Sequence, residues 1–147
     1  MIGKRKKIIY GLQDVSVVAK QLSVYVKDYS VVTFTGPLGA GKTTLIQSIL
    51  RQNGVADVIT SPTFTYVNLY TGADEHTFYH FDLYRLSTED DFIAAGFDEY
   101  LYQPDSTALI EWPAVIKDLL DHSVWHITLS YYEKDETKRV LTVSCKD

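Results

Sequence analysis

The segment with the clearest chemistry is the octapeptide Gly36-Pro37-Leu38-Gly39-Ala40-Gly41-Lys42-Thr43, which fits the pattern G-x-x-x-x-G-K-[ST]. Glycines at these spacings let successive backbone N–H groups turn toward one anion, and a helix that follows adds the positive end of its dipole. Lys42 would then meet the β- and γ-phosphates, Thr43 would suit Mg²⁺, and Thr44 would lie near the α-phosphate. Residues 36–44 therefore predict a nucleoside triphosphate site.

Two acidic residues downstream could complete such a site. Glu111 follows the apolar run 108–110, the position where a nucleotide hydrolase carries a carboxylate for Mg²⁺, and Asp82 lies within the segment 80–85. Each acid is a candidate for holding the Mg²⁺ shell or for orienting the attacking water. The residue types alone leave open which of the two acids positions the water.

Four further features near these residues each have two interpretations. His80 could be a metal ligand, but no second His or Cys stands at ligand spacing, which favours a hydrogen-bonded structural histidine. Arg85 could pair with an acid or with phosphate, and Trp112 could pack in the core or lie near the nucleotide. Ser61-Pro62-Thr63 could form a plain turn, or its hydroxyls could sense the γ-phosphate as switch loops do.

These residues need a scaffold that brings distant segments together. β-Branched and aromatic runs predict strands at 7–11, 31–35, 64–70, 76–83, 107–110, 124–132 and 139–144. Helical spacing and end signals predict helices after Asp14 as a cap, over 43–52 ended by Gly54, from 87 to Gly96, and over 115–120. The alternation predicts an α/β fold: a single P-loop NTPase-like domain over 1–147, with a mixed, mostly parallel central sheet flanked by helices and containing antiparallel hairpins.

The composition excludes several other classes of protein. The 147 residues are 46% hydrophobic and 22% charged, which argues against disorder, and a net charge of −5 gives no field to attract nucleic acid. Cys145 is the one cysteine, so no internal disulfide forms. We see no signal peptide and no membrane-spanning run, and we expect a cytoplasmic protein with no membrane contact.

Taken in order, residues 36–44, 61–65, 80–85 and 111–113 resemble the bacterial TsaE family, the ATPase of tRNA threonylcarbamoyladenosine (t6A) biosynthesis. The phosphate loop occurs in many families, whereas H-x-D-x-Y-R followed by E-W-P is far more specific. The resemblance implies a small ATPase that acts with the TsaD–TsaB pair, which modifies adenosine 37 of tRNAs reading codons that start with A. The ATPase would reset that complex between turnovers, and tRNA would be met only indirectly.

The resemblance also implies roles for individual residues. Lys42 would contact phosphate, Thr43 and Glu111 would hold Mg²⁺, Asp82 would be the catalytic or water-positioning acid, and Thr63 would be the switch-loop hydroxyl. ATP and Mg²⁺ are the implied cofactors. The stretch 90–96 departs from the more glutamate- and leucine-rich sequence that family members often carry, which leaves the partner-facing surface unassigned.

Two other functions compete with this interpretation. A small-molecule or nucleotide kinase could use the same loop, but kinases of that type bring several arginines to the phosphate, and here only Arg85 sits in a site motif. A nucleotide-gated binding module with incidental turnover is the second alternative. The absence of an N-K-x-D guanine signature favours ATP over GTP, but only weakly.

Overall fold

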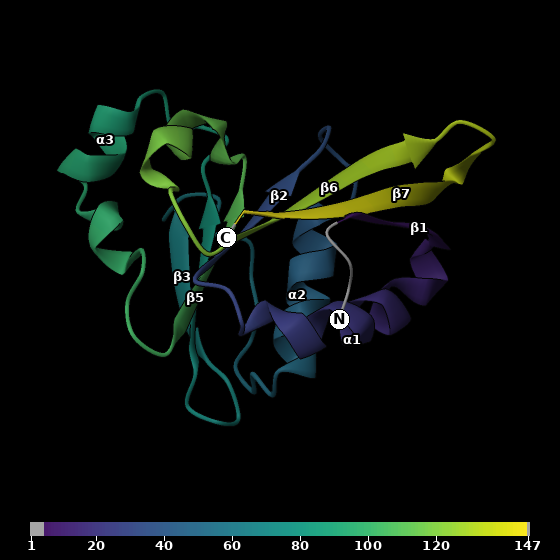
Figure 1. Ribbon diagram of the computed structural model, residues 1–147, viewed down its shortest axis with the longest axis horizontal. Helices are drawn as coiled ribbons and strands as arrows, with labels where there is room; N and C mark the ends of the chain where they lie inside the picture. Colours follow the sequence, from purple (N-terminus) through teal and green to yellow (C-terminus); the bar gives the residue numbers. More distant parts are fainter. Residues whose placement is uncertain (1–4, 147) are drawn as a thin grey trace.

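The computed structural model describes residues 5–146, which form one seven-stranded sheet in the order β1-β7-β6-β2-β5-β4-β3 (Figure 1). The strands are β1 (Arg5–Gly11), β2 (Val31–Thr35), β3 (Val67–Thr71), β4 (Thr77–Asp82), β5 (Ser106–Glu111), β6 (Val124–Tyr132) and β7 (Asp135–Lys146). The α-helices are α1 (Val15–Val26), α2 (Lys42–Gln52) and α3 (Glu89–Ala94), and the 3₁₀ helices are η1 (Leu12–Asp14), η2 (Phe97–Tyr100) and η3 (Pro113–Leu119).

The centre of the sheet is parallel and its edges are antiparallel. Strands β6, β2, β5 and β4 run parallel to one another, while β7 pairs antiparallel with both β6 and β1, and β3 pairs antiparallel with β4. This arrangement confirms the predicted mixed α/β sheet with antiparallel hairpins. Parallel central strands need cover on both faces, which explains why every residue of β5 and all but the last of β2 are buried.

Two hydrophobic cores cover the two faces of the sheet. Alternate residues of the central strands divide between them: Val32 and Leu109 join the core under α1 and α2, whereas Val31 and Ile110 join the core under α3, η2 and η3. Figure 1 shows α1 and α2 on one side of the sheet and α3 on the other. The central strands are therefore fixed from both sides, and their ends make a rigid platform.

The parallel pairing brings the predicted site residues to one edge of the sheet. The segment 36–41 leaves the carboxyl end of β2, Glu111 is the last residue of β5, and Asp82 is the last residue of β4. In the strand register Phe34 pairs with Glu111, and Glu111 pairs with Asp82. Ligands of open α/β sheets bind beyond the carboxyl ends of the strands, and that is where these residues lie.

The predicted start of one strand and the predicted capping contact of one helix are wrong for local reasons. Residues 64–66 are not part of a strand: Tyr66 has a left-handed φ of 64°, and the Phe64 side chain is 91% exposed. Asp14 does occupy the N-cap position of α1, but its side chain makes no capping hydrogen bond. Its φ and ψ of −102° and 6° continue η1 and differ from the extended backbone that a capping residue usually has.

Other ends follow the sequence signals more closely. The Thr88 hydroxyl accepts the Asp91 N–H at 3.1 Å and caps α3, and both Gly54 and Gly96 have the left-handed φ that ends a helix. The segment predicted as a helix over 115–120 is the 3₁₀ helix η3, and η2 was not predicted at all. Short 3₁₀ turns lack the periodicity that marks an α-helix.

No helix within residues 5–146 has the length and apolar character needed to cross a bilayer. The single-domain assignment over 1–147 and the cytoplasmic location stay predictions, and residues 1–4 and 147 lie outside the described part of the chain.

The packing of α2 against the sheet provides a test of this fold. Ile49 is fully buried on α2, so Ile49→Ala should lower the free energy of unfolding by about 2–5 kcal/mol, since the cavity left behind cannot close completely. The exposed Gln52 on the same helix is the control, and Gln52→Ala should change stability by no more than about 0.5 kcal/mol. Urea titrations of both variants measure the two effects, and equal midpoints would contradict the assigned helix face.

Candidate nucleotide-binding site

A cleft of about 390 Å³ opens at the carboxyl edge of β2, β5 and β4. It gathers predicted site residues from four separate segments of the chain, together with Tyr84, which had no assigned role. Its lining consists of Leu38, Gly39, Gly41, Lys42, Thr43, Thr44, Thr63, Asp82, Tyr84, Arg85, Glu111 and Trp112. The remaining members of the loop lie outside the lining: the Gly36 and Pro37 carbonyls accept hydrogen bonds from Lys42, and Ala40 is buried. Ser61 also lies outside the lining.

The backbone of the loop depends on its first and last glycines. A Cβ on Gly36 would lie 2.4 Å from the Leu129 carbonyl oxygen on β6, so the loop can leave β2 against β6 only without a side chain there. Gly41 has a φ of 97° and forms the N-cap of α2, which begins at Lys42. The N-terminus of α2 therefore faces the cleft with its first N–H groups and its dipole.

Lys42 is a buried cation with carbonyl and aromatic contacts. Its Nζ donates to the carbonyl oxygens of Gly36 and Pro37, the latter at 3.1 Å, and lies 3.9 Å from the centre of the Trp112 ring. The side chain is only 4% exposed, and burial lowers the pKa of Lys42, while the charges of Glu111 and Asp82 act against that shift. The ammonium is thus held at the base of the cleft by neutral acceptors, for which an anion could be exchanged.

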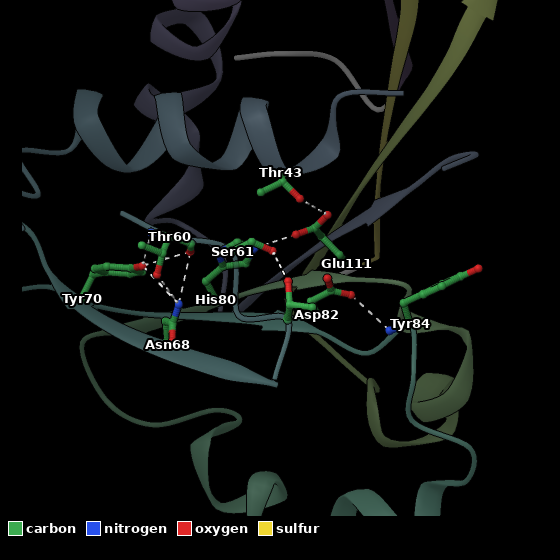
Figure 2. Close-up of polar contacts among 10 residues, drawn as sticks. Thr43, Thr60, Ser61, Asn68, Tyr70, His80, Asp82, Tyr84 and Glu111 are labelled. Carbon is green, nitrogen blue, oxygen red and sulfur yellow. Dashed lines mark hydrogen bonds and ion pairs between the residues drawn. The ribbon is translucent and has the colours of Figure 1, made fainter. Parts of the chain in front are cut away.

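Glu111 is a buried carboxylate with both oxygens occupied. The Thr43 hydroxyl donates to Oε1 at 2.8 Å, and the His80 ring nitrogen Nε2 lies 2.7 Å from Oε2 (Figure 2). Glu111 is 3% exposed and His80 is fully buried, and His80 Nδ1 has no hydrogen-bond partner among the described residues. An ionised carboxylate can only accept, so the geometry favours the tautomer with its proton on Nε2. His80 is thus a hydrogen-bonded histidine that orients Glu111.

Asp82 stands beside Glu111 at the end of β4 (Figure 2). Its Oδ1 accepts the Tyr84 backbone N–H at 3.1 Å, and the side chain is half-buried. Burial raises the pKa of Asp82, the neighbouring Glu111 carboxylate adds to this effect, and the Tyr84 N–H opposes it. A carboxylate with a raised pKa in a cleft is a better proton acceptor than an ordinary surface aspartate.

The segment 61–65 approaches the cleft from one side. The hydroxyls of Ser61 and Thr63 lie 3.0 Å apart, and Thr63 reaches the lining. The segment is anchored at its base, where Asn68 Nδ2 donates to the Thr60 carbonyl at 3.2 Å and Tyr70 Oη accepts the Thr60 N–H at 3.1 Å (Figure 2). Thr60, at the base of the segment, is therefore hydrogen-bonded to β3, while Phe64 within the segment is exposed.

Arg85 and Trp112 both line the cleft, and Trp112 also packs against the core under α3, η2 and η3, so both interpretations of Trp112 hold in part. A contact of either side chain with phosphate or nucleotide stays a prediction. The Tyr84 and Trp112 rings lie 4.8 Å apart, and the Arg85 guanidinium carbon lies 6.0 Å from the Tyr84 ring centre. Trp112 has a left-handed φ of 58°, an unfavourable conformation for a large side chain that places its ring next to Lys42.

Some contacts of the site could not be found in the sequence. Nothing in the segment 80–85 indicates that His80 bonds Glu111, which lies 31 residues away. Tyr131 and Arg139, on β6 and β7, contact the carbonyls of Leu38 and Ala40 across more than 90 residues. Only the strand order places these side chains beside the loop, so no local pattern could reveal them.

No group of three or more His, Cys, Asp or Glu side chains within residues 5–146 forms a ready-made metal site. The oxygens of Thr43 and Glu111 nevertheless converge, which is the donor type that a hard cation prefers.

The fold and the cleft define a P-loop-like α/β protein, and its geometry suggests a nucleotide-binding role. The model for the family "Threonylcarbamoyl adenosine biosynthesis protein TsaE" matches residues 10–141. The chain belongs to the TsaE family, and this membership supports involvement in t6A tRNA biosynthesis.

Individual relatives agree with this membership. The tRNA threonylcarbamoyladenosine biosynthesis protein TsaE of Rickettsia felis is 34% identical over 137 residues, which covers 92% of this chain and 77% of the relative. The TsaE of Treponema pallidum is 36% identical over 116 residues, covering 78% and 82%. The crystal structure of Bacillus subtilis YdiB superimposes with a TM-score of 0.78 at 25% identity, covering 98% of this chain and 87% of that structure.

The His80–Glu111 hydrogen bond has a predicted stability effect. His80→Leu removes the only donor to Oε2 that is seen among residues 5–146 and leaves a buried acceptor unpaired, so the free energy of unfolding should fall by about 1.5–3 kcal/mol. His80→Gln keeps an N–H donor and should recover part of that loss. Urea titration compares the variants, and a His80→Leu protein as stable as the His80→Gln protein would contradict this account.

Asp82 should reduce the stability of the ligand-free protein at neutral pH. Its pKa is higher in the folded than in the unfolded chain, so the folded state binds its proton more tightly, and stability falls as the pH rises above about 3.8. Asp82→Asn should therefore raise the unfolding midpoint at pH 7, and this gain should shrink as the pH is lowered toward 4. Thermal unfolding from pH 4 to 7 measures it, and a gain that is constant with pH would exclude titration of Asp82 as the cause.

Proposed function

We propose that this protein is a Mg²⁺-dependent ATPase that acts with the TsaD–TsaB complex in the threonylcarbamoylation of adenosine 37 of tRNA. The observation that carries the proposal is the convergence of Lys42, Thr43, Glu111 and Asp82 in one cleft at the N-terminus of α2. Membership of the TsaE family supports the pathway, and the cleft supports the chemistry.

The chain's own groups would bind the triphosphate in three ways. The N–H groups of the loop and the first turn of α2, including Thr44, would donate to phosphate oxygens. Lys42 would leave its carbonyl partners in part to meet the β- and γ-phosphates, since a phosphate is the stronger acceptor. Arg85 is the cationic side chain that would reach the outer end of the cleft.

The residues present fit a magnesium ion. Thr43 and Glu111 would hold it, because their oxygens already lie 2.8 Å apart at the phosphate end of the cleft. Magnesium supplies charge neutralisation of the phosphate oxygens when bound. His80 would keep the Glu111 carboxylate in place while Thr43 turns its hydroxyl lone pairs outward.

Asp82 is the group proposed to position or activate water. The water oxygen would form a bond to the γ-phosphorus while the bond to the β–γ bridging oxygen breaks, which yields ADP and inorganic phosphate. Asp82 would accept a hydrogen bond from that water, and its raised pKa makes it a useful acceptor of the proton.

The segment 61–65 would report the phosphate state to partners. Thr63 would sense the γ-phosphate from the lining, and loss of phosphate would release the segment while Thr60 stays tied to β3. The 91% exposed ring of Phe64 is then moved relative to the partner. In this proposal the change resets the TsaD–TsaB complex between turnovers, and tRNA is met only through that complex.

The placement of the arginines favours hydrolysis over phosphoryl transfer to another substrate. Arg51 donates to the Val55 carbonyl and Arg139 to the Ala40 carbonyl, so both are engaged in holding backbone. Arg85 is the one arginine in the lining of the cleft. A kinase would need more cations around the transferred phosphate, and a nucleotide-gated binding module would need no water-positioning acid beside Glu111.

Turnover assays test the proposal. The isolated protein should hydrolyse ATP slowly, and GTP more slowly still. The TsaD–TsaB pair should raise the rate of ATP hydrolysis, because in this proposal a partner supplies groups that stabilise the transition state. Lys42→Ala should lower kcat/KM by roughly a hundredfold while circular dichroism shows an intact fold.

The controls separate the alternatives. Lys138→Met removes an exposed lysine near the start of β7, outside the lining of the cleft, and should leave turnover unchanged. A rate that TsaD–TsaB does not alter over a wide concentration range would count against the proposed partnership. Glu111→Ala should bind ATP without hydrolysing it, and full support of tRNA modification by that variant would favour the binding-module alternative.

A further inference from the structure

The phosphate-binding loop is held from outside by the β6–β7 hairpin, which extends from the sheet in Figure 1. Two carbonyl groups of the loop accept hydrogen bonds from hairpin side chains: the Tyr131 hydroxyl donates to the Leu38 carbonyl at 3.4 Å, and Arg139 Nε donates to the Ala40 carbonyl at 3.2 Å. Neither hairpin residue lies in the lining of the cleft. Their role therefore differs from that of the residues that face the nucleotide.

The two hairpin residues form one unit. Tyr131 and Arg139 are opposite each other in the β6–β7 register, and the Arg139 guanidinium lies 4.3 Å from the centre of the Tyr131 ring. The guanidinium also donates through Nη1 to the carbonyls of Glu136 and Lys138 at 2.9 and 3.2 Å. Arg139 thus ties the end of the hairpin to the loop with donors that a lysine could not supply in this geometry.

Because the peptide bond is planar, a hydrogen bond that fixes the direction of a C=O also fixes the direction of the N–H in the same peptide. In a trans peptide the C=O of one residue and the N–H of the next point in opposite directions. A Leu38 carbonyl held outward by Tyr131 points the Gly39 N–H away from the hairpin, and an Ala40 carbonyl held outward by Arg139 does the same for the Gly41 N–H. Both glycines line the cleft, whereas Tyr131 and Arg139 do not.

The loop needs such support because its glycines are conformationally free. Gly39 and Gly41 have φ values of 81° and 97°; a Cβ on Gly41 would meet nothing within 4 Å, and one on Gly39 would meet only the Tyr131 hydroxyl, at 3.3 Å, so few neighbours pack against the two residues. Without an external partner, either peptide could rotate and turn its carbonyl oxygen toward the phosphates, which would repel them.

We infer that Tyr131 and Arg139 are positioning residues of the phosphate-binding loop, which fix the Gly39 and Gly41 N–H groups toward a nucleoside di- or triphosphate. This inference rests on the proposed nucleotide binding and adds the determinants of its affinity. It also makes the β6–β7 hairpin part of the site, since displacement of the hairpin would release the Gly39 and Gly41 N–H groups from their fixed orientation together.

The test compares two substitutions that remove the same charge from adjacent positions of β7. Arg139→Met removes the donors and keeps an unbranched stem, whereas Lys138→Met removes an exposed lysine and leaves its backbone carbonyl in place. Isothermal titration with MgADP should show an affinity about three- to tenfold weaker for Arg139→Met, the loss expected for one or two hydrogen bonds, and a change within about twofold for Lys138→Met. Tyr131→Phe, which loses only the long 3.4 Å bond, should give a smaller loss than Arg139→Met.

A second measurement separates positioning from a general loss of stability. The backbone amide resonances of Gly39 and Gly41 in ¹⁵N spectra of the ligand-free protein should shift in Arg139→Met and stay in place in Lys138→Met. Should Arg139→Met fail to fold, Arg139→Lys and Tyr131→Phe provide the same comparison and should shift the same two resonances.

The outcomes distinguish the inference from the function on which it rests. Wild-type protein that binds neither MgADP nor MgATP would overturn both. Wild-type binding that Arg139→Met and Arg139→Lys leave unchanged, with the Gly39 and Gly41 resonances unmoved, would overturn the inference alone.

Discussion

The site depends on keeping a carboxylate buried next to a buried ammonium. Charged groups leave water only at a large cost unless each is paired and hydrogen-bonded, and Glu111 meets this requirement through Thr43 and His80. Lys42 meets it through two loop carbonyls and the face of Trp112. The parallel pairing of β2, β5 and β4 makes this possible, because it puts the loop, Glu111 and Asp82 at the same edge. If any of these strands shifted in register, a charge would be buried without a partner.

Several features of this edge reduce stability and are retained together. Burial works against the ionised form of Asp82 and against the charge on Lys42, and Trp112 and Tyr66 both have left-handed backbone conformations. Such features persist where the surrounding structure holds them in place. Here the two hydrophobic cores on either side of the central strands hold these residues in place, and the stability that they contribute offsets the unfavourable features of the cleft.

The two halves of the sheet contribute to the site in different ways. Strands β4 and β5 end in the acidic residues and lead into the aromatic and cationic rim of Tyr84, Arg85 and Trp112. The β6–β7 hairpin adds nothing to the lining but contacts the back of the loop. The residues that face the cleft and the residues that hold the loop from behind therefore come from different parts of the sheet.

The sequence by itself determined the residues with chemistry and most of the elements that carry them. The G-x-x-x-x-G-K-[ST] pattern, the apolar run before Glu111 and the alternation of strands and helices are local, so residue types and spacing were sufficient for them. The cleft-facing placement of Asp82, Arg85 and Trp112 followed from which strands are neighbours. The His80–Glu111 bond, the left-handed turn at Tyr66 and the contacts of Tyr131 and Arg139 were decided only by the tertiary structure. They join residues that are far apart in the chain or oppose local propensity, and the free energy that fixes them comes from burial and strand order, which no short stretch of sequence contains.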